Sequence, residues 1–340
     1  TISNFKIQNK SDKGKNAELS FINTLNEYAE IKNVKFDNYT IEGKSDIKKT
    51  AGLIVTNHGI ISGVDIINGS INNIGKKASA SGYVFNNEKD GVIENCHIEN
   101  IGAKDSNLKS GFVEKNYGKI TNCSTTLSVN SKDSAGGFVS ENVGDIEQCS
   151  SQCNVDSKKC AGGFCANNEG NIVSCNAEGS VKSKTNIGTT KCGGFVGENS
   201  GIIKNCSSTG AIEGQEYVGG FCGYNKNIGK IDSSKSKSNV KSKTNIKSIH
   251  CGGFVGVDEG KIENCTFEGK ADGCVDFEKL VGIGVGVTIG AILIIICVCL
   301  SIKRYKINDI FNRSMEKIEK ANEKYREYYS DYEEYLFNMN

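Results

Sequence analysis

The strongest constraint on this chain is a unit that recurs along most of its length. Two clear copies read GGFVSENVGDIEQC from Gly136 and GGFVGENSGIIKNC from Gly193. Counted from the Phe of each copy, Asn stands four residues on, Gly six, Ile eight and Cys eleven. Nine positions, 26 to 33 residues apart, open a unit with an aromatic residue or Leu: Phe21, Leu53, Tyr83, Phe112, Phe138, Phe164, Phe195, Phe221 and Phe254.

A unit of this length cannot bury its apolar side chains alone, but copies stacked about 4.8 Å apart share one core. Turn residues such as Asn-x-Gly divide each unit into three short strands. We therefore predict an all-β fold over residues 1–272, a right-handed parallel β-helix of about nine coils whose first part, 1–50, is degenerate. The chain has no Pro, as expected when almost every strand donates hydrogen bonds to both neighbours.

A second segment predicts a membrane anchor. Residues 280–302 contain no charged side chain, and a helix of that length spans about 35 Å, enough for a hydrocarbon core of about 30 Å. Lys303, Arg304 and Lys306 follow directly, which predicts a cytoplasmic C-terminus. We expect a juxtamembrane linker at 273–279, one transmembrane helix at 280–302 and a short cytoplasmic helical tail at 303–340. The N-terminal part would then lie outside the plasma membrane.

The anchor itself offers two further features. Gly282, Gly286 and Gly290 share one helix face and would permit self-association, together with the tail. Cys297 and Cys299 near the cytoplasmic end are candidates for lipidation, with apolar packing as the alternative.

The repeat GGFVGxNxGxIxNC resembles the GLUG motif of surface and secreted proteins, including bacterial adhesins and protist surface proteins. The resemblance covers roughly residues 20–272 in eight clear or fair copies. It implies a solenoid used as a stalk or as a binding surface, and the single membrane segment looks more like a protist protein than a bacterial one.

Composition and motifs argue against several kinds of chemistry. The balance of 41 Lys and Arg against 40 Asp and Glu argues against a nucleic-acid partner. The three His residues fall in unrelated frames, and no metalloprotease, hydrolase or phosphate-binding motif is present. We therefore expect no catalysis, no metal and no cofactor. A β-helix enzyme acting on polysaccharide and a purely structural spacer are the alternatives to an adhesive or ligand-binding surface protein.

The repeated Asn and Cys have structural interpretations. We expect each Asn to close its own turn and to stack on the next, with a row that binds sugar or metal as the alternative. Thirteen Cys precede the anchor, and those at the eleventh offset are expected as buried apolar filler. Cys160 and Cys192 occupy similar places on successive units and are the candidate disulfide.

Two surface features suggest ligands and modification. The sequence VKSKTNI occurs from Val181 and from Val240, in loops expected on one edge about 10 Å apart. Its lysines are the candidate site for an anionic glycan or a ligand on a host or neighbouring surface, with a solvated rim as the alternative: Lys182, Lys184, Lys241 and Lys243. Six sequons mark candidate glycosylation sites of an exported domain: Asn9, Asn38, Asn68, Asn122, Asn205 and Asn264.

Overall fold

In the computed structural model, the described residues are 1–8, 17–43, 47–73, 79–103, 107–183, 190–242, 250–272 and 274. They belong to one compact unit, Thr1–Asp276, and a second unit comprises Phe277–Asn340. Within the described ranges, no helix has the length and apolar character needed to cross a bilayer. The predicted transmembrane helix and helical tail lie outside these ranges.

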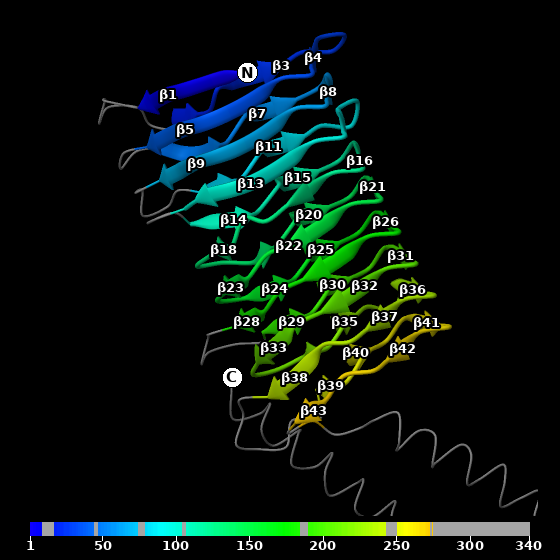
Figure 1. Ribbon diagram of the computed structural model, residues 1–340. Helices are drawn as coiled ribbons and strands as arrows, with labels where there is room; N and C mark the ends of the chain where they lie inside the picture. The colour runs from blue at the N-terminus through cyan, green and yellow to red at the C-terminus, as the bar shows by residue number, and fades with distance from the viewer. Residues whose placement is uncertain are drawn as a thin grey trace, which may run out of the picture. The chain divides into compact units, whose positions relative to one another are not determined.

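The first unit is an all-β parallel solenoid built from five sheets, A to E, in which each strand pairs with its counterparts on the adjacent coils (Figure 1). Sheet A contains β1 (Ile2–Gln8), β5 (Lys35–Gly43), β9 (Asp65–Asn73), β13 (His97–Gly102), β17 (Ser124–Thr125), β22 (Ser150–Gln152), β27 (Asn176–Glu178), β32 (Ser207–Thr209), β37 (Lys235–Ser236) and β42 (Thr266–Phe267). Sheet B contains β2 (Ala17–Leu19), β6 (Ile47–Ala51), β10 (Ser79–Ser81), β14 (Leu108–Ser110), β19 (Ala135–Gly136), β24 (Cys160–Gly162), β29 (Lys191–Gly193), β34 (Val218–Gly219) and β39 (Cys251–Gly252).

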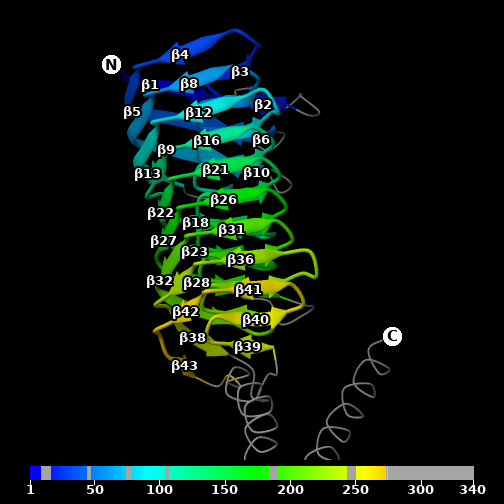
Figure 2. The same ribbon diagram turned by 90° about the vertical axis from the view of Figure 1, so that its right-hand side faces the viewer.

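The other three sheets complete each coil; Figure 2 looks onto sheet D. Sheet C contains β3 (Ile22–Leu25), β7 (Ile54–Asn57), β11 (Val84–Asn87), β15 (Val113–Asn116), β20 (Val139–Asn142), β25 (Cys165–Asn168), β30 (Val196–Asn199), β35 (Cys222–Asn225) and β40 (Val255–Asp258). Sheet D contains β4 (Glu30–Lys32), β8 (Ile60–Ser62), β12 (Val92–Glu94), β16 (Lys119–Thr121), β21 (Asp145–Glu147), β26 (Asn171–Val173), β31 (Ile202–Lys204), β36 (Lys230–Asp232) and β41 (Lys261–Glu263). Sheet E contains β18 (Val129–Asn130), β23 (Val155–Ser157), β28 (Val181–Ser183), β33 (Ala211–Gly214), β38 (Asn239–Ser242) and β43 (Ala271–Asp272).

The nine strands of sheet C are joined by eight full turns of the chain, close to the predicted number of coils. The prediction of three strands per unit is wrong, because a later coil such as β24 to β28 contains five. The extra strands arise at tight corners, where two residues suffice to turn the chain from one sheet to the next. The spacing of the repeats therefore predicts the number of coils. The sequence pattern does not distinguish strands that are separated only by a two-residue corner.

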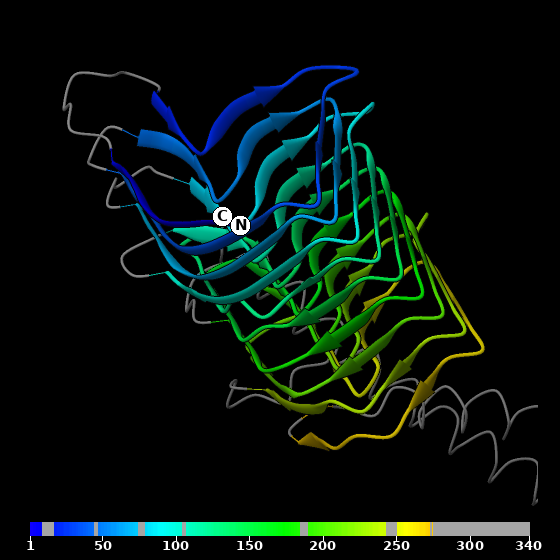
Figure 3. The same ribbon diagram turned by 45° about the horizontal axis from the view of Figure 1, so that its top comes forward.

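Sheets B and C meet at a sharp inward angle within each coil, as Figure 3 shows. The paired Gly of each unit stand at this bend. A Cβ on Gly136 would lie 1.9 Å from the carbonyl oxygen of Val139, and one on Gly137 would lie 2.0 Å from that of Gly163. Because no side chain fits at such distances, the Gly pair allows the two sheets to fold against each other.

The aromatic residues that open the units form an inward ladder of stacked rings from Tyr83 to Phe254. Neighbouring rings have centroids 4.7 to 4.9 Å apart and planes within 15° of parallel. Phe21 departs from the ladder: it is 38% exposed and meets Phe5 and Phe36 edge-on. It lies next to β3, the edge strand of sheet C, and the following position is Leu53, which offers no ring to stack on.

The repeated Asn form a second inward ladder. Each side-chain Nδ2 donates to the Oδ1 of the Asn on the following coil at 2.8 Å, and to the carbonyl of a nearby Gly in its own turn at 3.1 to 3.4 Å. The expectation that each Asn closes its turn and stacks on the next is therefore confirmed. The ladder ends at the exposed Asp258, whose Oδ1 accepts from Asn225 at 2.7 Å. Its other members are Asn57, Asn87, Asn116, Asn142, Asn168 and Asn199.

Candidate functional site

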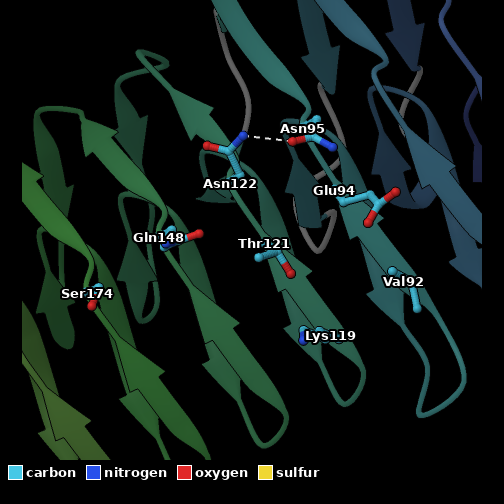
Figure 4. A pocket seen from close by; sticks show the side chains of 8 residues that line it. All are labelled: Val92, Glu94, Asn95, Lys119, Thr121, Asn122, Gln148 and Ser174. Atoms are coloured by element: carbon cyan, nitrogen blue, oxygen red, sulfur yellow. Dashed lines mark hydrogen bonds between the residues drawn. The ribbon is translucent and has the colours of Figure 1, made fainter.

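An open groove of about 700 Å³ lies where sheet D turns into sheet A. Figure 4 shows its lining side chains on successive coils, with strand residues on one side and corner residues on the other. The strand residues are Val92, Glu94, Lys119 and Thr121, and the corner residues are Asn95, Asn122, Gln148 and Ser174.

The corner residues owe their position to an unusual backbone conformation. Two residues connect sheets D and A in every coil, and the first of them has a positive φ, for example 50° at Asn122 and 54° at Gln148. Asn enters this left-handed region more readily than most residues. The corner places its side chain outward and the following Cys inward, which explains the Asn-Cys pair that ends many units.

The groove presents amides and hydroxyls along its corner wall, and the charged side chains of Glu94 and Lys119 on its strand wall. Asn122 Nδ2 donates to Asn95 Oδ1 at 2.7 Å, and Ser62 donates to Glu94 at 2.9 Å (Figure 4 shows the first of these bonds). Lys119 faces Glu147 of the next coil at 3.8 Å. Among the described residues, no group of three His, Cys, Asp or Glu is placed to hold a metal ion. Such a surface can orient a polar ligand by hydrogen bonds.

The predicted lysines are only partly brought together. Lys182 and Lys241 are exposed in sheet E two strands apart, as the repeat register predicts. Between them, however, Glu213 is in register with both, and Asp272 follows Lys241. The row therefore alternates in sign. Lys184 and Lys243 lie outside the described residues.

The predicted disulfide is absent: Cys160 and Cys192 are both buried and are not joined to each other. In the register of β24 and β29, Cys192 lies opposite Ala161, one residue along from Cys160, so the two side chains face opposite sides of sheet B. The disulfide that forms instead joins Cys251 to Cys274. It links the last strand of sheet B to the end of the solenoid.

The Cys at the eleventh offset form a buried column, as expected for core filler. Their sulfur atoms lie 3.3 to 3.5 Å from a backbone N–H of the preceding coil. The column contains Cys123, Cys149, Cys175 and Cys206, together with Cys96, which a two-residue insertion moves to the thirteenth offset. All five are free thiols, and the half-buried Cys265 continues the column. Burial also raises the pKa of Cys153, outside this column, to about 11. Its thiol stays protonated at neutral pH and is a poor nucleophile.

Five of the six candidate glycosylation sites lie within the described residues, and all five are exposed at positions with positive φ: Asn38, Asn68, Asn122, Asn205 and Asn264. Asn9 lies outside those ranges, as do the anchor residues Gly282, Gly286, Gly290, Cys297 and Cys299. Glycosylation, lipidation and helix packing at these residues stay predictions.

A charged cluster at the edge of sheets B and C escaped the sequence reasoning. Glu198 contacts both Lys191 and Lys226, and the Lys191 ammonium lies 5.2 Å from the centroid of the Tyr224 ring. Burial acts to raise the pKa of Glu198, but the hydrogen bonds from the two lysines outweigh it and hold the pKa below its usual value. Burial of one carboxylate between two lysines is typical of a structural contact. The only sequence signal for it is the repeat register itself.

Comparison with known families supports the repeat interpretation. The profile described as "The GLUG motif" matches residues 192–213, which span β29 to β32 and the start of β33. Neither the curated proteins nor the solved structures that were compared gave a match. The matched segment occupies one coil of a solenoid in which most other coils keep the same offsets. The chain therefore carries the GLUG motif, within a parallel β-solenoid of like repeats.

Proposed function

We propose that this chain is a single-pass plasma-membrane protein that holds its solenoid outside the cell for adhesion or ligand binding. The observation that carries the proposal is the order of its segments. A solenoid with the GLUG motif precedes the uncharged stretch 280–302, and Lys303, Arg304 and Lys306 follow that stretch. The uncharged length supports a membrane helix, and the basic flank supports a cytoplasmic C-terminus.

Protease treatment of intact cells tests this topology. Cells displaying the chain with an epitope after Asn340 should lose the solenoid to added protease and keep the epitope with its membrane helix. Permeabilised cells, in which both sides are accessible, should lose both. Protection of the solenoid in intact cells would overturn the orientation.

The charges on the outer faces support binding or display over catalysis. Glycoside-cleaving enzymes use two carboxylates on either side of one bond. Here several carboxylates instead pair with a lysine on the adjacent coil: Lys115 with Glu141 at 2.7 Å, Lys119 with Glu147 at 3.8 Å, and Lys230 with Glu263 at 3.5 Å. Such exposed pairs contribute little to stability and leave a surface with small local net charge.

A structural spacer is the second candidate, favoured by the alternating row at Lys182, Glu213, Lys241 and Asp272. Replacing the four candidate lysines, Lys182, Lys184, Lys241 and Lys243, by Ser distinguishes the spacer hypothesis from the hypothesis of a surface that binds an anionic ligand. An anionic ligand predicts salt-sensitive binding of the wild type to heparin beads and weaker binding of the variant. Equal binding by both chains would favour the spacer.

A further inference from the structure

One outer face of the solenoid is almost free of charge. It consists of three columns of side chains on four consecutive coils, from the corner after sheet D across sheet A. We call it the hydroxyl–amide face, and its residues are Asn122, Ser124, Thr126, Gln148, Ser150, Gln152, Ser174, Asn176, Glu178, Asn205, Ser207 and Thr209. All twelve are exposed or half-buried, and Glu178 alone carries a charge. By contrast, charged residues make up 24% of the whole chain.

The columns are in strict register. Ser124 pairs with Ser150, Ser150 with Asn176, and Asn176 with Ser207. Neighbouring coils therefore present hydroxyl or amide groups at the strand spacing of about 4.8 Å. Charged residues bound the face at both ends, namely Glu99 before it and Lys235 and Lys237 after it.

Hydrogen bonds along the columns orient several of these groups. Ser207 donates to Asn176 Oδ1 at 2.7 Å, and His97 Nδ1 lies 2.8 Å from Ser124 Oγ. Each amide still has further donor or acceptor positions that point to solvent. The groups are thus partly fixed before any ligand arrives, which lowers the entropy lost on binding.

Access to the face is open. The connection from sheet D to sheet A is two residues long in every described coil, so none of these described corners carries a long loop beside the columns. The connections that vary in length lead from the last strand of a coil to sheet B. They range from two residues between β23 and β24 to eight residues between β38 and β39. The groove of about 700 Å³ runs along the corner column of this same face, where Asn122, Gln148 and Ser174 form one wall (Figure 4).

We propose that the hydroxyl–amide face and its groove bind a neutral glycan, extended along the solenoid axis. The proposal rests on the proposed function, because it names the ligand class of the adhesive surface. A sugar chain offers closely spaced hydroxyls that both donate and accept, as do Ser, Thr, Asn and Gln. A sulfated or sialylated chain would find no cation among the twelve residues, and Lys119 on the other wall of the groove faces Glu147 at 3.8 Å. A protein partner would find none of the aromatic anchors typical of interfaces among the twelve residues.

A pair of substitutions tests the face. Ser150→Arg with Asn176→Arg places two bulky cations on adjacent coils in its centre. The matched control, Asn171→Arg with Ile202→Arg, makes the same change at exposed, registered positions of sheet D. A milder pair, Ser150→Ala with Asn176→Ala, removes hydrogen bonds without adding charge or bulk. The full chain is made in a host without N-glycosylation, since sequons at Asn122 and Asn205 fall on the face.

The purified full chains, in mild detergent, are applied to an array of β-glucans, chitooligosaccharides, mannans, and sulfated and sialylated glycans. We expect the wild type to bind a neutral glycan with little change between about 0.15 M and about 1 M salt. The Arg pair on the face should weaken binding at least about 10-fold, the Ala pair several-fold, and the control pair less than about 2-fold.

Other outcomes overturn the proposal. These are binding to sulfated or sialylated glycans only, equal loss in the face and control pairs, or no binding to any neutral glycan. None of them bears on topology, which the protease experiment decides separately. Cells that display the chain and adhere equally well with either Arg pair would retain the proposed function and reject this face.

Discussion

Replacing Asn168 by Ala tests the buried amide ladder at its centre. Asn168 is 1% exposed and takes part in three side-chain hydrogen bonds. Its Nδ2 donates to Asn199 at 2.8 Å and to the Gly170 carbonyl at 3.1 Å, and its Oδ1 accepts from Asn142 at 2.8 Å. The substitution removes all three bonds and leaves their partners inside the solenoid.

The structure sets the size of the effect. A typical hydrogen bond contributes about 1 kcal/mol net, so three bonds amount to about 3 kcal/mol. Each partner keeps one other hydrogen bond: Asn142 Nδ2 donates to the Gly144 carbonyl, the Gly170 carbonyl accepts from the Ile202 N–H at 2.9 Å, and Asn199 Oδ1 accepts from the Gly201 N–H at 3.3 Å. No further penalty for an unpaired buried group is therefore added. We expect a loss of about 3 kcal/mol, against about 0.5 kcal/mol for the half-exposed neighbour Asn167→Ala.

The direction of the ladder sharpens this prediction. Every Asn of the ladder donates its side-chain N–H to the following coil. Only the last member therefore needs no donor group on its own side chain, and that member is Asp258. Its carboxylate also accepts from the Gly260 N–H at 3.1 Å. Asn168→Asp should therefore be at least as damaging as Asn168→Ala, because it buries a charge and loses both donated bonds. Asp258→Asn should change stability by less than about 1 kcal/mol.

Thermal unfolding by far-UV circular dichroism, together with hydrogen exchange, measures these effects on the full chain in mild detergent. Exchange matters because repeat arrays can unfold in parts, and a single midpoint then hides local loss. Faster exchange should centre on β25 and β30. If Asn168→Ala and Asn167→Ala melt within a degree of each other, the ladder does not stabilise the coils as argued.

Three further predictions concern other parts of the fold. Phe195→Asp buries a charge between rings 4.9 Å away on each side and should melt several coils, seen as lost far-UV signal. Cys251→Ser should cost about 3 kcal/mol by loop closure and speed exchange in β39, whereas Cys160→Ser should leave the number of disulfides found by mass spectrometry unchanged. Burial raises the pKa of the Glu114 carboxyl, so the stability of the wild type should fall as the pH rises through that pKa. The Glu114→Gln variant cannot ionise at this position and should therefore lose less stability between about pH 4 and pH 7 in thermal melts.

The inward-facing part of the fold could be predicted from the sequence. Residues at the same offset occupy the same place on each coil, so the recurrence of Phe and Cys indicates which columns are buried. Phe195 and Cys175 are buried, as the repeat predicts. Asn168 is buried as well, whereas the sequence predicts only that it closes its turn and stacks on the next Asn. Phe21 differs because it belongs to the edge coil, where the identity of the neighbouring residues changes.

Features that depend on the exact register between coils could not be predicted. Connections of different length separate Cys160 from Cys192, and a one-residue offset between strands places their side chains on opposite faces. Glu213 lies between Lys182 and Lys241 because the intervening coil contributes a strand to the same row. The VKSKTNI pattern by itself does not reveal that neighbour.

The hydroxyl–amide face follows from how the repeat accommodates changes in length. Insertions enter mainly between the last strand of a coil and sheet B, where a longer connection disturbs no pairing. The corner between sheets D and A has no such freedom, since a positive φ at residues such as Asn122 makes the whole turn in two residues. Uniform corners keep the columns of sheet A in register even where the steps between units differ in length. The proposed array of ligand-binding groups therefore fits this corner better than the row of sheet E, where Lys182 and Lys241 alternate with Glu213.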